Sequence, residues 1–65
     1  MTATEKRLEF LRARLAYIGG LKQPTEQQRL FAELAGRLLG GDALTAKDAR
    51  DLKTLEAAEK ADERA

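Results

Sequence analysis

The stretch Thr25–Gly41, TEQQRLFAELAGRLLGG, decides the fold of this 65-residue chain. Its apolar side chains recur every three or four residues, the spacing of one face of an α-helix. It opens with Thr25 and Gln28 at the spacing of a capping box and closes on a glycine doublet, which are signals of a helix start and a helix end. We expect a helix over 25–39, with these side chains facing a core: Leu30, Phe31, Leu34, Leu38 and Leu39.

Two further helices are predicted, near 3–18 and 45–63. Like the helix over 25–39, each begins at a threonine placed three residues before a side chain that can hydrogen-bond back to it. The pairs are Thr2 with Glu5 and Thr45 with Asp48. Glycine doublets at 19–20 and 40–41 are placed to end the first two helices, and they favour a left-handed terminal residue at each end.

The composition predicts an all-α protein. Valine is absent and Ile18 is the only isoleucine, so the β-branched residues that favour strands are scarce. We expect a single domain over residues 1–65, arranged as a small three-helix bundle running up, down and up. The alternative is a helical hairpin with a third helix that partly projects.

The third helix has little to bury. Leu52 and Leu55, with Ala49 and Ala58, are all that it offers to a core, and no apolar side chain larger than alanine follows Leu55. The last stretch, EAAEKADERA at 56–65, resembles helices of Glu, Ala and Lys that are supported by propensity and ion pairs. We expect it to be a projecting arm or a frayed end, and its removal after Ala58 to leave the fold stable.

Charge is unevenly distributed although the formal net charge is only +1. Residues 1–20 hold four basic and two acidic side chains, whereas residues 42–65 hold five basic and seven acidic ones. In an up-down-up bundle the first and third helices run parallel, so the basic front can lie beside the acidic back. The asymmetry is too small to indicate nucleic-acid binding by itself.

Histidine, cysteine, serine and asparagine are all absent. Catalytic triads, thiol chemistry and the usual zinc sites need these residues, so we expect no catalytic, cofactor or metal site, and no enzyme. Carboxylate pairs on the third helix, such as Glu56 with Glu59, are expected to lie on a solvated face. The glycine doublets lack the strand, lysine and hydroxyl side chain of a phosphate-binding loop.

One stripe on the first helix interleaves basic and aromatic side chains at helical spacing: Arg7, Phe10, Arg14 and Tyr17. Such a stripe can anchor a protein partner, because aromatics and arginine are enriched at interface hot spots. It can equally neutralise phosphates and stack on bases, with Lys6 and Lys22 as further phosphate contacts. The third interpretation is structural: the two aromatics widen the core face and the arginine stems pack along its edge.

The run TAKDARDLKTLEAAEKADERA at 45–65 is similar to helical segments of small plasmid mobilisation accessory proteins, the TraD-type conjugal transfer family. IGGL at 18–21 resembles a glycine-glycine-leucine stretch of the same proteins, although the order of the two pieces is reversed here. The resemblance implies an accessory to a DNA-processing assembly. It assigns a role to no individual residue.

These features together predict a non-enzymatic interaction protein from a bacterial mobile element, plasmid or phage. It would bind a protein partner as an assembly factor or as an inhibitor, in the manner of anti-CRISPR proteins. The alternatives are non-sequence-specific DNA binding in a mobilisation complex, and a structural homo-oligomer such as a two-fold dimer. Because the first turns are highly charged and no long apolar run follows, we expect a soluble cytoplasmic protein without a membrane partner.

Overall fold

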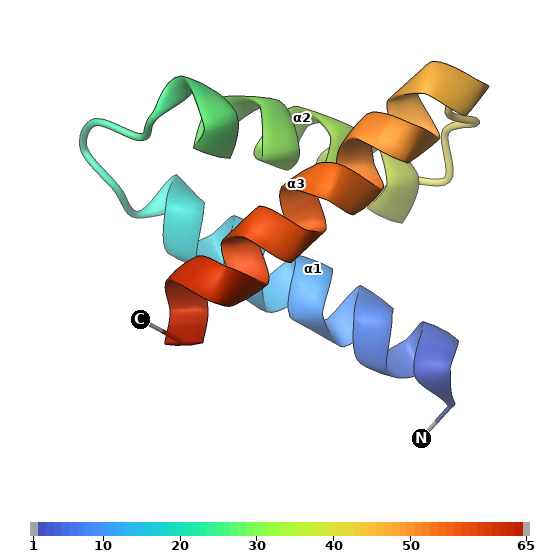
Figure 1. Cartoon of the computed structure of the whole chain (residues 1–65), viewed down its shortest axis with the longest axis horizontal. Coiled ribbons are helices and arrows are strands. Elements are labelled where there is room, and N and C mark those ends of the chain that lie inside the picture. Colours follow the sequence, from blue (N-terminus) through green and yellow to red (C-terminus); the bar gives the residue numbers. More distant parts are fainter. Residues whose placement is uncertain (1, 65) are drawn as a thin grey trace.

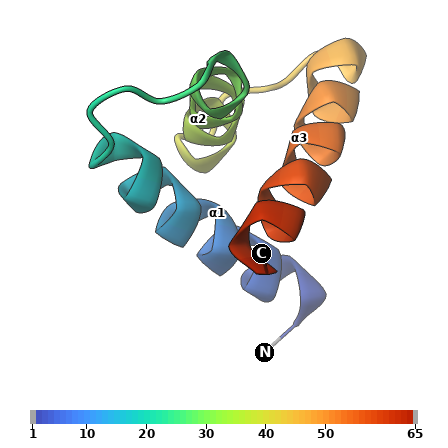
Figure 2. The ribbon, with the colours of Figure 1, turned by 60° about the vertical axis from the view of Figure 1, so that its left-hand side comes forward.

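The computed structural model describes residues 2–64 and contains, over that range, three α-helices joined by two short loops (Figure 1). Helix α1 spans Ala3–Gly19, α2 spans Glu26–Leu39 and α3 spans Ala46–Arg64. α2 packs on both α1 and α3, and α3 descends from the end of α2 and crosses α1 (Figures 1 and 2). The predicted all-α bundle is confirmed, with helix bounds close to those expected.

The three threonine starts are confirmed. The hydroxyl oxygens of Thr2, Thr25 and Thr45 each accept a hydrogen bond of 3.1 Å from the backbone N–H three residues later. At Thr25 the capping box is complete, because the Gln28 side chain also accepts from the Thr25 backbone N–H at 2.7 Å. These bonds satisfy donors that a helix start otherwise leaves without a partner.

The two glycine doublets end their helices in different ways. After α2, Gly41 takes a left-handed φ of 87°, and the Asp42 N–H donates to the Arg37 carbonyl at 2.9 Å. This is a Schellman ending, as the sequence predicts. The left-handed ending predicted for α1 is wrong: Gly20 has a φ of −88°, and a tighter bond from its N–H to the Tyr17 carbonyl, 3.1 Å long, closes the last turn instead.

The core lies where α2 packs on both neighbours. Its fully or nearly buried apolar side chains are Leu11, Ile18, Phe31, Leu34, Ala35 and Leu52. Leu30, predicted to face inward, is 43% exposed, because it lies about 100° around the helix from Phe31, the centre of the buried face. Ala49, also predicted to contribute, is exposed. Leu52 is therefore the one large apolar side chain of α3 that is buried completely within the described residues.

The outer half of α3, residues 56–64, does not project. It crosses over α1, as the red turns in Figures 1 and 2 show. The prediction of solvated carboxylates is also wrong here, because Glu56 is only 6% exposed and Glu59 has no exposed surface. The physical reason is ionic: arginines on α1 supply the partners that a carboxylate needs in order to be buried.

Candidate interaction surface

The basic and aromatic stripe of α1 faces the outer half of α3. Arg7 makes a two-pronged ion pair with Glu56, in which Nη2 lies 2.6 Å and Nε 3.0 Å from Oε1. Nε also reaches the second carboxylate oxygen at 3.2 Å. The hydrogen bonds to Glu56 raise the pKa of Arg7 above its ordinary value, despite the opposing effect of burial. Arg7 therefore stays charged well beyond neutral pH, and this pair fixes the middle of α3 on the first turns of α1.

Arg14 joins α1 to α3 less closely. Its Nη2 lies 3.5 Å from Oε2 of Glu59 and 3.4 Å from Oδ2 of Asp62. The side chains of Arg14 and Glu59 are 10% and 0% exposed, yet Nε of Arg14 and Oε1 of Glu59 are buried without a hydrogen-bond partner. The Arg14 guanidinium also lies over the ring of Tyr17, 4.5 Å from its centroid. The ion pair of Arg14 with Glu59 is therefore longer than that of Arg7 with Glu56, and it leaves hydrogen-bonding positions on both side chains unfilled.

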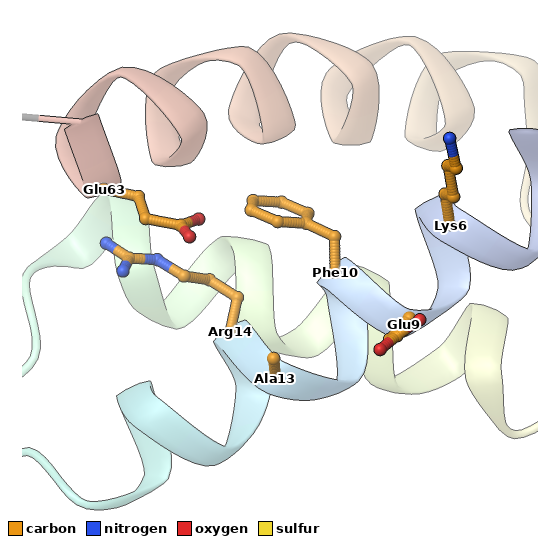
Figure 3. Close-up of a pocket in the computed structure, with 6 residues that line it drawn as sticks. All are labelled: Lys6, Glu9, Phe10, Ala13, Arg14 and Glu63. Carbon is orange, nitrogen blue, oxygen red and sulfur yellow. The ribbon is translucent and has the colours of Figure 1, made fainter.

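Between these two ion pairs Phe10 points from α1 toward α3 and lines an open groove (Figure 3). We call it the Phe10 groove. It has a volume of about 380 Å³ and is lined by Lys6, Glu9, Phe10, Ala13, Arg14 and Glu63. A second hollow of about 310 Å³ adjoins it and is lined by Phe10, Lys60, Glu63 and Arg64. The ammonium of Lys60 lies 5.3 Å from the centre of the Phe10 ring.

The four side chains of the predicted stripe thus lie in different environments. Arg7 and Arg14 are engaged with carboxylates of α3, and the half-buried Phe10 packs against the core, as the structural interpretation predicts, and also lines the groove. Tyr17 is 52% exposed and is not among the residues that line the groove. Of the two lysines predicted as phosphate contacts, Lys6 lines the groove, whereas Lys22 is exposed in the loop between α1 and α2.

Sequence reasoning missed the contribution of α3 to this surface. Glu56 and Glu59 pair with the arginines, Glu63 lines the groove, and Lys60 lines the adjoining hollow. One signal did point this way: the basic front and the acidic back of the chain were expected to lie side by side, and the ion pairs between α1 and α3 confirm it.

Within residues 2–64 no group of carboxylates is arranged to hold a metal ion. None of the three helices described there combines the length and apolar content needed to cross a lipid bilayer. Comparison of the chain with protein-family models, with curated proteins and with solved structures finds no match. The resemblance to mobilisation accessory proteins therefore stays a prediction.

Proposed function

We propose that this chain is a non-enzymatic interaction protein and that it binds another protein through the Phe10 groove. The observation that carries the proposal is the position of Phe10, a half-buried aromatic ring that lines an open groove together with residues of α1 and α3. Aromatic side chains that become fully desolvated in the complex carry much of the binding energy of protein interfaces. Grooves between helices also receive side chains of partner segments.

Binding through this groove suits a protein that acts by occupying a partner's surface. It supports both roles expected from the sequence, an assembly factor or an inhibitor encoded by a plasmid or phage and acting in the cytoplasm. Neither role requires chemistry at the groove. The partner's function changes because a surface that it needs is covered.

The charge arrangement favours a protein partner over DNA. Phosphate binding depends on cations that are free to replace counterions. Arg7 and Arg14, two of the cations predicted for that task, are turned toward Glu56, Glu59 and Asp62. Lys6 and Lys22 remain exposed, but Lys6 lies in the first turns of α1 and Lys22 in the loop that follows the other end of that helix.

A steric block of the groove tests the proposal with little effect on the fold. Ala13 is exposed and lines the groove, whereas Ala16 is exposed on the same helix and does not line it. We expect the tagged wild-type chain to retain a protein from an extract of its native host. Ala13→Arg should weaken that retention by about tenfold, a loss of about 1.4 kcal/mol, while Ala16→Arg retains the protein.

Three outcomes would contradict this function. The first is that Ala13→Arg and Ala16→Arg retain equal amounts of the partner protein. The second is that the retained material is nucleic acid that is released at moderate salt. The third outcome is that the only species recovered is the chain itself. Sedimentation across concentration would then show a dimer, and the structural homo-oligomer would replace the proposed function.

A further inference from the structure

We infer that the partner segment in the Phe10 groove is acidic and that it carries a large apolar side chain beside a carboxylate. This inference rests on the proposed function and adds the chemistry of the partner. It is argued from the charges at the rim of the groove and from the contact between Lys60 and Phe10.

Two carboxylates of α3 face α1 and are buried there. Glu56 and Glu59 are buried against the two arginines of α1, so they contribute little negative charge to the rim. The third carboxylate on this face, Asp62, is exposed but also pairs with Arg14. An incoming segment therefore meets a less acidic surface than the sequence of α3 indicates.

The walls of the groove and of the adjoining hollow expose three cations, Lys6, Lys60 and Arg64, none of which makes an ion pair within residues 2–64. Two carboxylates oppose them. In Figure 3 Glu9 points away from α3, and Glu63 is turned toward Arg14 and Phe10, whereas Lys6 extends toward α3. Across the groove and the adjoining hollow together, these three cations outnumber the two carboxylates by one; Lys6 lines the groove, and Lys60 and Arg64 line the hollow.

Lys60 makes the position of the partner's carboxylate specific. Its ammonium lies 5.3 Å from the centre of the Phe10 ring, within the range of a cation–π contact. An apolar side chain that packs on this ring must displace the ammonium, which then lacks a partner. A carboxylate next to the apolar side chain provides a new partner for the Lys60 ammonium, so an ion pair replaces the lost cation–π contact.

The size of the groove limits what enters it. At about 380 Å³ it lies near the lower end of the range for small-molecule pockets. This space suits one large side chain of a longer segment. The rest of the segment would lie along the rim, where the lysines are.

Two small probes with the same ring and opposite charge test the inference on the full chain. Indole-3-acetate carries a carboxylate and tryptamine an ammonium. We expect indole-3-acetate to shift the backbone amide resonances of Lys6, Phe10, Ala13 and Glu63 in a saturable way. Its affinity should exceed that of tryptamine by about fivefold or more.

Charge reversal at the groove provides the matched comparison. Lys60→Glu should remove or invert the preference for indole-3-acetate, whereas Lys53→Glu, an exposed lysine of the same helix outside the groove, should leave it unchanged. The two substitutions change the net charge of the protein equally. A difference in probe preference between the variants therefore reports the local contact and not the overall electrostatic field.

Equal or tighter binding of tryptamine would overturn the acidic partner while leaving the groove intact as a binding site. Absence of saturable shifts with either probe would overturn the apolar side chain as well. The proposed function has its own test in the comparison of Ala13→Arg with Ala16→Arg. Failure of the partner chemistry and failure of protein binding can therefore be told apart.

Discussion

Glu59 has no exposed surface, yet only one of its carboxylate oxygens meets a partner. Burial of a charge is costly unless the charge is paired and its remaining hydrogen-bonding positions are filled. The contact with Arg14 is 3.5 Å long and leaves a nitrogen of Arg14 without a partner too. At the scale of single residues, this pair orients the outer half of α3 more than it stabilises the fold.

We therefore expect the single and double replacements of this pair to differ. Glu59→Ala should lower the free energy of unfolding by about 2–3 kcal/mol, because Arg14 stays mostly buried with Asp62 as its remaining partner. Arg14→Met combined with Glu59→Met should be within about 1 kcal/mol of the wild type, since neither charge is then buried. Urea denaturation of all the variants measures both quantities.

Asp62→Ala is the control for this cycle. Asp62 is 61% exposed, so its removal should cost less than about 1 kcal/mol. If the double variant proved less stable than Glu59→Ala alone, the buried pair would be a net source of stability and our interpretation would be wrong.

At the scale of elements, α3 consists of two parts held by different forces. Its first half packs on α2 through Leu52 and, partly buried, Leu55. Its outer half lies on α1 through charged side chains and through Lys60 over Phe10. The exposed part of these contacts, Arg14 with the 61% exposed Asp62 and Lys60 over Phe10, weakens as salt screens it, whereas buried ion pairs and apolar packing respond much less.

Raising NaCl from about 0.1 M to about 1 M shortens the screening length from about 10 Å to about 3 Å. We expect the backbone amides of residues 57–63 to exchange with solvent about threefold faster or more over this range, because the outer half of α3 opens more often. Hydrogen exchange followed by NMR measures the change. The amides of 31–38 in α2 are the control and should respond less; a parallel response in both helices would contradict the division of α3 into two parts.

The elements themselves were predictable because their signals are local. A threonine three residues before a glutamine, or a glycine doublet after an apolar face, is determined within one helical turn. The burial of Glu56 and Glu59 was not predictable in this way, since it depends on how α3 crosses α1 about 45 residues away in the chain. The stripe on α1 identified Phe10, but the groove around Phe10 exists only once the outer half of α3 lies beside it.

At the scale of the whole molecule, α3 contributes one fully buried apolar side chain to the core, with the partly buried Leu55 packed against it. A domain of 65 residues is expected to have a free energy of unfolding of only about 3–10 kcal/mol. Leu52 has no exposed surface and is the single buried apolar side chain that α3 contributes within the described residues. The stability of the whole chain is therefore sensitive to this position.

Leu52→Ala should cost about 2–5 kcal/mol through lost burial and the cavity that remains. For a domain of this size we expect the melting temperature to fall by about 10 °C or more. Leu30→Ala, which truncates a leucine that is 43% exposed, should shift it by only a few degrees. Thermal unfolding of both variants, followed by far-UV circular dichroism, measures the two melting temperatures. Equal decreases would mean that the core is centred elsewhere.

The contact between Arg7 and Glu56 has a further consequence, which concerns the order of folding. Both large packing contacts join helices that are neighbours in the chain, α1 with α2 and α2 with α3. The contact between Arg7 and Glu56 instead closes a loop of 49 residues, and closing a long loop costs entropy that only the completed contact offsets. We therefore expect the groove to form after the contacts of α2 during folding, so that substitutions of Arg7 or Glu56 change the unfolding rate more than the folding rate.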